Sequence, residues 1–331
     1  MKGTYHIVVQ NNRIKFEFDI KRNITVVKGD SATGKTTLIS MIDTFDRLGE
    51  ESGINVVCPR RCLTINNANW EAVISSVSEC IIFVDEENTV IKTHEFARKI
   101  QDTDNYYVLV TRDYLPNLPY SVEEIYGIHV SGKYADLRQT YNSFYHIYNL
   151  DAVMRHQSVP RIIVEDSNSG HEFFASAARA DDSNVISANG KSKIRKLLES
   201  SEGQETLVIA DGAAFGSEMD DVYLYMQRHA EVSAYLPESF EWIILSSGLI
   251  DGVRIEKMLE HPEEYIESQE HFSWERYFTH LLVQETKDTY MKYSKSKLNP
   301  AYLQSRMKGR IIGVLPEEIR SLFDTESETN E

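Results

Sequence analysis

Two glycines, a lysine and a threonine at fixed spacing form the clearest chemical signal in the sequence. Residues 29–36, Gly-Asp-Ser-Ala-Thr-Gly-Lys-Thr, fit the phosphate-binding pattern G-x-x-x-x-G-K-[ST] at every fixed position. Glycines let the backbone curl so that successive N–H groups face inward, and the dipole of the following helix points at the same place. The pattern predicts a nucleoside triphosphate site formed by Gly29, Asp30, Ser31, Ala32, Thr33, Gly34, Lys35, Thr36 and Thr37.

Two residues of this loop have a role beyond shape. Lys35 is placed to reach the β and γ phosphates, and the Thr36 hydroxyl to hold a magnesium ion. An apolar strand expected at residues 24–27 and a helix expected at residues 37–42 supply the context that such a loop requires. A chance glycine-rich turn is the alternative. The chain has no guanine-reading N-K-x-D sequence, so ATP is favoured over GTP, with Mg²⁺ as its companion.

A second signal is a pair of acids at the end of an apolar run. Residues 81–84, Ile-Ile-Phe-Val, are followed by Asp85 and Glu86. Such a run predicts a buried parallel strand that delivers a carboxylate to the carboxyl edge of the sheet. The alternative is that the two acids cap a helix that begins near Thr89.

Together these motifs resemble P-loop ATPases of the additional-strand class, the group that contains AAA and RecA-like proteins. The resemblance implies that Asp85 holds magnesium through its water shell and that Glu86 orients the attacking water. It also implies a further strand, here residues 54–58, and a sensor strand, here residues 106–110, that leads to Arg112. Arg112 is either a trigger or an ordinary surface arginine. The catalytic residues implied are Lys35, Glu86 and Arg112.

Length and composition restrict the class of protein. A chain of 331 residues with 41% apolar and 26% charged residues suits a globular protein of two domains. No apolar run approaches the length of a bilayer span and the first residues lack a signal-peptide pattern, so we expect a cytoplasmic protein. The cysteines Cys58, Cys62 and Cys80 lack the second pair that a zinc site needs, which favours buried or free thiols.

Charge is distributed unevenly along the chain. Residues 1–150 carry 16 basic and 19 acidic side chains, whereas residues 151–331 carry 19 and 32. The net charge of −16 argues against broad nonspecific binding to nucleic acid. One basic segment, residues 287–310, is a candidate nucleic-acid surface, with a solvated helix face as the alternative. Its cations and tyrosines are Lys287, Lys292, Lys295, Lys297, Arg306, Lys308, Arg310, Tyr290, Tyr293 and Tyr302.

Strand and helix patterns restart after Pro160. Apolar runs at residues 161–164, 184–188, 206–210 and 240–245 alternate with helix-like segments, which predicts a second parallel sheet. The expected fold class is α/β, a three-layer P-loop domain followed by a second parallel α/β domain. The expected boundaries are 1–142 for the ATPase domain, 143–160 for a connection, 161–286 for the second domain, and 287–331 for the basic segment and an acidic tail.

Residues 161–250 resemble a Toprim domain, the metal-binding fold of topoisomerases, primases and OLD-type nucleases. Glu165 matches the acid that ends the first strand, and Gly190-Lys191-Ser192 matches the turn of the second unit. Asp211 matches the first acid of the family's Asp-x-Asp. An ATPase domain joined to a C-terminal Toprim domain is also the layout of OLD-type proteins.

Two departures from this family affect the metal site. Asp166 stands where the family usually has Gly, and Ala213 replaces the second Asp. Because magnesium takes several oxygen ligands, the missing carboxylate must come from Asp166, Glu218, Asp220 or Asp221, or the site is inactive. The expected metal ligands are Thr36 and Asp85 in the first domain and Glu165, Asp211, Glu218 and Asp221 in the second.

Two functions remain open at this stage. The first is an ATPase that gates a Toprim-like, metal-dependent nuclease acting on nucleic acid. The second is an ATP-driven switch whose Toprim-like domain is inactive and binds a protein partner. The basic segment favours the first, while Ala213 and the acidic C-terminal half favour the second. A homo-oligomer is compatible with both.

Overall fold

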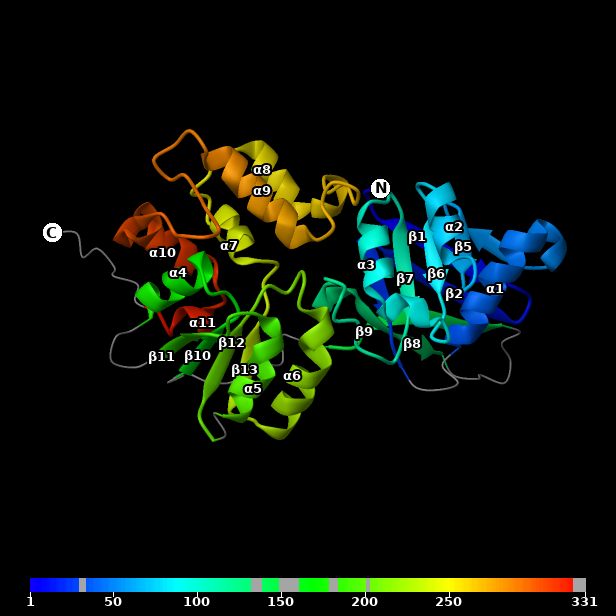
Figure 1. Cartoon of the computed structure of the whole chain (residues 1–331), viewed down its shortest axis with the longest axis horizontal. Coiled ribbons are helices and arrows are strands. Elements are labelled where there is room, and N and C mark those ends of the chain that lie inside the picture. The colour runs from blue at the N-terminus through cyan, green and yellow to red at the C-terminus, as the bar shows by residue number, and fades with distance from the viewer. Residues whose placement is uncertain (30–33, 132–138, 149–160, 179–183, 201–202, 324–331) are drawn as a thin grey trace. The chain divides into compact units, whose positions relative to one another are not determined.

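The chain divides into two compact units (Figure 1). The computed structural model describes residues 1–29, 34–131, 139–148, 161–178, 184–200 and 203–323. The first unit comprises residues 1–148 and 262–273, and the second comprises residues 149–261 and 274–331. Both contain helices and parallel strands, which confirms the α/β class. In the described part of the chain, no helix is both long and apolar enough to cross a membrane.

Nine strands of the described residues form the sheet of the first unit, in the order β4-β1-β2-β9-β8-β3-β7-β6-β5. Its second half is a run of parallel neighbours, and every residue of its three central strands is buried. Apolar side chains on both faces of these strands explain why they lie inside the unit. The strands of this run are β8 (Ile125–Val130), β3 (Ile24–Val27), β7 (Tyr106–Val110), β6 (Ile81–Val84) and β5 (Cys62–Ile65).

The other half of this sheet is mostly antiparallel. The strand β1 (Tyr5–Gln10) pairs with β2 (Ile14–Ile20) and with β4 (Asn55–Val57). The prediction that residues 54–58 form the further strand near Asp85 is therefore wrong, because β4 lies at the far edge. The strand between β3 and β6 is β7 instead.

One strand falls where a connection was expected. Residues 140–146 form β9 (Thr140–His146), which lies between β2 and β8. Its sequence is polar, but two contacts hold it in the sheet. The Phe144 ring stacks on Phe18 with centroids 4.0 Å apart, and the Asn142 side chain donates a hydrogen bond to the Lys15 carbonyl oxygen at 3.3 Å. The first unit therefore extends beyond the predicted boundary at residue 142.

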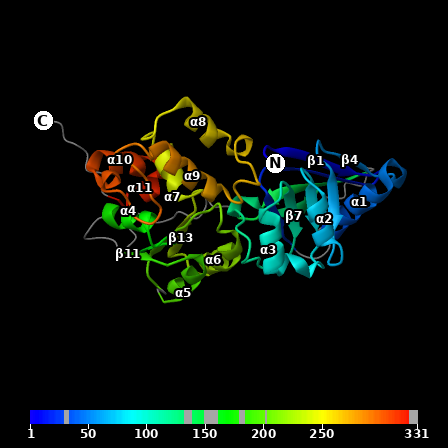
Figure 2. The same ribbon diagram turned by 45° about the horizontal axis from the view of Figure 1, so that its top comes forward.

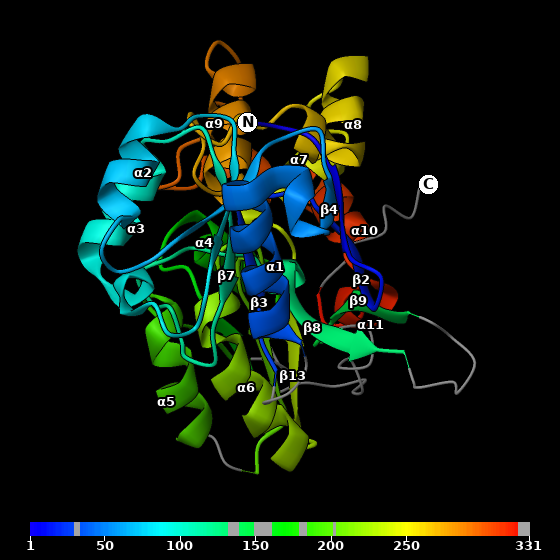
Figure 3. The ribbon, with the colours of Figure 1, turned by 90° about the vertical axis from the view of Figure 1, so that its right-hand side faces the viewer.

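Among the described residues, three helices pack on this sheet. The helix α1 (Lys35–Leu48) buries an apolar stripe that includes Leu38, Ile39 and Ile42, as its 3.6-residue period predicts. The helix α3 (His94–Gln101) begins at Thr93, whose hydroxyl accepts the Phe96 N–H at 3.2 Å. Figure 3 shows α1 between the parallel and antiparallel strands, with α2 (Trp70–Ser76) and α3 on the other side of the parallel run.

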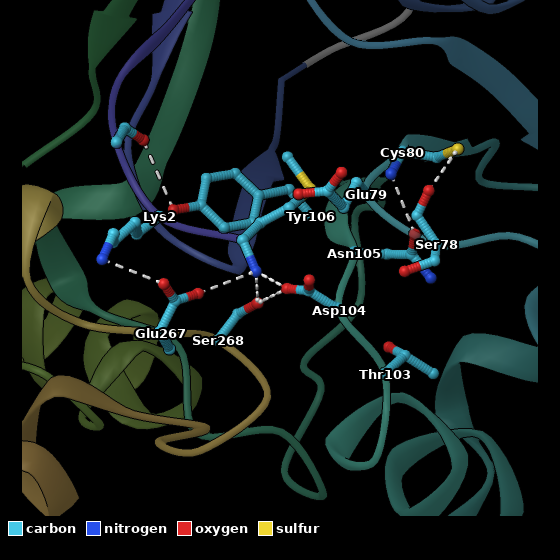
Figure 4. A network of polar contacts seen from close by, with 12 residues as sticks. Lys2, Ser78, Glu79, Cys80, Thr103, Asp104, Asn105, Tyr106, Glu267 and Ser268 are labelled. Carbon is cyan, nitrogen blue, oxygen red and sulfur yellow. Dashed lines mark hydrogen bonds and ion pairs between the residues drawn. The ribbon is translucent and has the colours of Figure 1, made fainter.

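A segment distant in sequence completes the first unit. Residues 262–273 follow the helix α8 (Val253–Glu260) and return to the N-terminus. There the Met1 amino group pairs with the Asp104 carboxylate and donates to the Ser268 hydroxyl at 3.0 Å. The Lys2 ammonium pairs with Glu267 at 3.1 Å (Figure 4). This segment was expected to belong to the second domain, and local sequence gave no indication of these distant partners.

In the second unit, four strands of the described residues form a sheet with the order β11-β10-β12-β13, and every pairing is parallel. This confirms a second parallel α/β sheet. Figures 1 and 2 show α5 (Ile194–Glu199) and α6 (Gly216–Arg228) on one side of it and α4 (Ser169–Ala177) on the other. The strands are β10 (Arg161–Val164), β11 (Asn184–Ser187), β12 (Thr206–Ile209) and β13 (Val232–Tyr235).

The predicted strand at residues 240–245 is wrong, because this segment begins α7 (Phe240–Ser246). The Ser239 hydroxyl accepts the Trp242 N–H at 3.1 Å and so caps the start of a helix. A short apolar run fits a buried helix as well as a buried strand, and here the cap decides. The fourth strand of the sheet is β13, eight residues closer to the N-terminus.

Three more helices follow in this unit, namely α9 (Trp274–Thr286), α10 (Ser305–Val314) and α11 (Glu317–Arg320). The helix α7 packs against α9 and α10. Residues 287–323 therefore belong to the compact second unit and are not a separate segment. The acidic tail, residues 324–331, lies outside the described residues.

Candidate functional site

The phosphate loop is described at its two ends. Gly29 and Gly34 have φ angles of 134° and 88°, which are positive values that favour glycine. A Cβ atom at Gly34 would also lie 3.3 Å from the Phe16 ring. Lys35 is buried, and its ammonium group donates to the Gly29 carbonyl oxygen at 2.5 Å. The ammonium thus lies at the base of the loop, while residues 30–33 are outside the described part.

Strand register brings the loop and the acids to one edge of the sheet. Val26 of β3 pairs with Leu109 of β7, and Leu109 pairs with Val84 of β6. All three strands are parallel, so the residues that follow them leave the same edge. The Thr111 N–H donates to the Val27 carbonyl oxygen at 3.1 Å, which continues the ladder to the last residue.

Two of the predicted catalytic side chains meet at this edge. The Glu86 carboxylate forms two bonds with the Arg112 guanidinium, to Nε and to Nη2, each at 3.1 Å. The Arg112 side chain is 51% exposed and that of Glu86 is 27% exposed, so solvent reaches the pair. The two parallel bonds fix the orientation of the carboxylate more than they stabilise the fold.

The acids do not cap the following helical turn. That turn, Thr89–Lys92, is capped by Asn88, whose side chain accepts the Val90 N–H at 3.4 Å. The Asp85 carboxylate instead accepts the Glu86 N–H at 2.7 Å. The helix-cap alternative for these acids is therefore wrong.

The oxygen donors at this edge fit a magnesium ion bound with ATP. Thr36 is exposed in the first turn of α1, and Asp85 is only partly buried. A hydroxyl and a carboxylate that keep contact with solvent are the ligands that suit a magnesium ion carried by phosphate. Thr36 and Thr37 also line a hollow of about 310 Å³ that extends along α1 to Ile54.

In the second unit, Glu165 and Asp211 meet at the carboxyl edge of β10 and β12. The Asp211 N–H donates to Glu165 Oε2 at 3.1 Å, and Asp211 Oδ1 accepts the Phe240 N–H at 3.1 Å. Burial raises the pKa of Glu165 to about 7 and the pKa of Asp211 well above its ordinary value, and the nearby Glu275 carboxylate adds to both shifts.

Two lysines lie in the field of these acids. The Lys295 ammonium bonds Glu275 Oε1 at 2.5 Å, and the Lys191 ammonium donates to the Ala214 carbonyl oxygen at 2.6 Å. Burial acts to lower the pKa of Lys295, but Glu241, Glu275 and Asp211 outweigh it and raise that pKa. Burial lowers the pKa of Lys191. This edge therefore carries its own cations.

The replacement acids proposed from the sequence have contacts of their own, and Glu218 shares with Glu165 an effect on the Lys191 ammonium. Asp166 caps α4, because its carboxylate accepts the Asn168 N–H at 2.9 Å and the Gly170 N–H at 2.8 Å. Glu218 accepts the Ser217 hydroxyl at 3.3 Å, and Asp221 is exposed on α6. Within the described ranges, no three His, Cys, Asp or Glu side chains are grouped to hold a metal ion. Magnesium binding by Glu165, Asp211, Glu218 and Asp221 therefore stays a prediction.

Sequence reasoning missed the part played by Glu241, Glu275 and Lys295. They come from α7, from the start of α9 and from the segment after α9, so no local motif connects them with Glu165. Lys295 was assigned to the basic segment as a phosphate contact.

Two tyrosines of that segment are also part of the core, since Tyr293 is 2% exposed and Tyr302 is 0% exposed. Tyr290 is 67% exposed. Lys287, Lys292, Lys297, Arg306 and Arg310 are exposed cations. The Arg310 guanidinium donates to the Gly248 carbonyl oxygen at 2.6 Å. Buried tyrosines cannot stack on bases, so this pattern favours a solvated face over a nucleic-acid surface.

No protein-family model and no curated protein matches this chain.

Proposed function

We propose that the first unit binds ATP with magnesium and hydrolyses it. One observation carries the proposal: the loop that holds Lys35, the acids Asp85 and Glu86, and Arg112 follow three adjacent parallel strands at one sheet edge. A glycine-rich turn that occurred by chance would have no reason to lie beside an acid pair and an arginine.

Each residue has a role in this proposal. The Lys35 ammonium neutralises the β and γ phosphates, and Thr36 and Asp85 would hold the magnesium ion, which draws charge from the γ phosphate. Glu86 orients the attacking water. Arg112 holds the Glu86 carboxylate at two points, so it positions this acid until a γ phosphate competes for the guanidinium.

For the second unit we propose the role of a switch that responds to the ATP state and binds a protein partner, in an arrangement compatible with a homo-oligomer. The acid pair Glu165 and Asp211 is the observation that keeps a nuclease acting on nucleic acid as the second candidate. The lysines beside these acids and the buried tyrosines of the basic segment favour the switch.

A single pair of variants tests the ATPase proposal. Glu86→Gln removes the carboxylate that orients water but keeps its size, so ATP binding is retained and hydrolysis falls about 10²-fold or more. Glu87→Gln is the matched control, because Glu87 is the adjacent acid and is exposed. Phosphate release and binding of a fluorescent ATP analogue are measured for both. Equal hydrolysis by Glu86→Gln and the wild type would contradict the role of Glu86.

A further inference from the structure

Two cysteines lie at an unusual point of the first sheet. In the described part of the chain, β4 and β5 are the two edge strands of the sheet, yet only residues 58–61 connect them. Cys58 follows β4 directly, and Cys62 is the first residue of β5. The helix α1 packs against both edge strands, and the short connection brings the end of β4 close to the start of β5.

A pocket of about 330 Å³ opens beside this connection. Its lining includes Cys58, Cys62, Arg60, Arg61, Val56 and Asp46. Arg60 pairs with Glu79 at 2.9 Å, and Arg61 pairs with Asp46 at 2.9 Å, so both guanidinium groups are held in place. A small polar molecule can therefore enter a space that contains both thiols.

The two thiols line the same pocket, and both bond to the backbone of Arg60. The Arg60 N–H donates to Cys58 Sγ at 3.5 Å, and the Cys62 thiol donates to the Arg60 carbonyl oxygen at 3.8 Å. The neighbouring Cys62 side chain lowers the pKa of Cys58 to about 7. The Cys58 side chain and burial raise the pKa of Cys62. The other titratable groups that act on the pair are His6, Arg60, Cys80 and Asp46. Cys58 is thus the better nucleophile, and Cys62 is the thiol next to it.

The third cysteine provides an internal comparison. Cys80 is 6% exposed, its thiol donates to the Ser78 carbonyl oxygen at 3.2 Å, and its N–H donates to Asn105 Oδ1 at 2.9 Å (Figure 4). Burial raises the pKa of Cys80. A buried thiol of this kind is expected to be inert.

We propose that Cys58 and Cys62 form a reversible thiol–disulfide pair that a small hydroperoxide oxidises. The Cys58 thiolate attacks one peroxide oxygen, the O–O bond breaks, and the departing oxygen takes a proton, which leaves a sulfenic acid on Cys58. The Cys62 sulfur then attacks the Cys58 sulfur, so that an S–S bond forms and an S–O bond breaks. Water leaves with the Cys62 proton. The two thiols together lose two electrons, and the hydroperoxide gains them.

Hydrogen peroxide applied to the reduced full chain tests this pair. After treatment, free thiols are blocked with N-ethylmaleimide and the digested protein is examined by mass spectrometry. The expected product is a peptide in which a disulfide links Cys58 and Cys62, so that it is two hydrogens lighter than the reduced form. Dithiothreitol should convert this product back to the reduced form. In a separate measurement at pH 7, iodoacetamide should alkylate Cys58 at least about tenfold faster than Cys80, because only Cys58 is substantially thiolate there.

Three variants separate the roles. Cys62→Ser should stop the reaction at a Cys58 sulfenic acid that dimedone traps, and Cys58→Ser should abolish the product. Cys80→Ser is the matched control and should behave as the wild type. The proposal is overturned if the wild-type thiols all remain open to N-ethylmaleimide, if Cys80 enters the main disulfide, or if Cys58 passes to sulfinic acid while Cys62 stays free. These wild-type results do not depend on how the variants fold.

Discussion

The carboxyl edges of the two parallel sheets use similar residues in different surroundings. At the first edge, Asp85 and Glu86 keep contact with solvent, and Glu86 is held by a half-exposed arginine. At the second edge, Glu165 and Asp211 are likewise only partly buried, but this burial raises their pKa values, and lysines stand beside them. An acid at the end of a buried strand is thus not enough to define a metal or phosphate site, because burial and nearby cations decide what it can bind.

The largest effect is expected at the first edge, from Lys35→Ala. A phosphate cradle without its cation loses most of its electrostatic attraction, so ATP affinity should fall at least about 10³-fold, equivalent to about 4 kcal/mol. Isothermal titration calorimetry measures the affinity. Lys92→Ala is a control, since Lys92 is also a lysine of the first unit but is exposed and pairs with Asp113 at 2.6 Å. Unchanged ATP affinity in Lys35→Ala would contradict a phosphate site at the first edge.

The first edge was the easier of the two to predict from sequence. Its strands β3, β6 and β7 are continuous apolar runs, and the predicted site residues follow directly after each run. The order of strands was not predictable, because pairing between β3 and β7 depends on residues some 80 positions apart. The second edge was predicted only in part, since Lys295 reaches it from the segment predicted to be a nucleic-acid surface.

The next effect concerns a buried acid of the first unit that lies away from the edge. Glu124 accepts the Thr25 hydroxyl at 3.1 Å and faces Arg22 at 3.6 Å, yet burial raises its pKa to about 7. The folded chain therefore keeps a proton that the unfolded chain has lost, so this acid lowers the free energy of unfolding as pH rises from about 4.5 to about 7. The loss amounts to at most about 3 kcal/mol.

Urea unfolding at pH 5 and pH 8 checks this sign. Glu124→Gln should remove that part of the pH dependence. The free energy of unfolding of the variant minus that of the wild type should therefore be more positive at pH 8 than at pH 5. Glu123→Gln is the control, because the Glu123 side chain is 52% exposed. If both variants show the wild-type pH dependence, Glu124 is ionised in the folded state without penalty, and burial in the first unit does not act on acids as it does at the second edge.

A smaller effect is expected from the second edge itself. Lys295→Met keeps the length of the side chain but leaves Glu275 and Asp211 without the ammonium group. Because the Lys295 side chain is 39% exposed, the loss should be about 1–2 kcal/mol, below the value for a fully buried pair. Lys297→Met, at an exposed lysine, should change stability by less than about 0.5 kcal/mol. Equal effects of the two variants would show that Lys295 does not neutralise this edge.

For the last measurement, the effect of magnesium on the melting temperature, we expect no change. The result separates the two functions proposed for the second unit. A magnesium site filled at 100 times its dissociation constant would add about 2.7 kcal/mol to the free energy of unfolding. In Lys35→Ala, which removes the contribution of bound ATP, millimolar Mg²⁺ is expected to leave the melting temperature unchanged, because lysines already supply positive charge near Glu165 and Asp211. Differential scanning calorimetry makes the measurement. If the melting temperature rises with Mg²⁺ and Asp211→Asn abolishes the rise, the second edge binds the metal despite its lysines, and the nuclease replaces the switch as the better proposal.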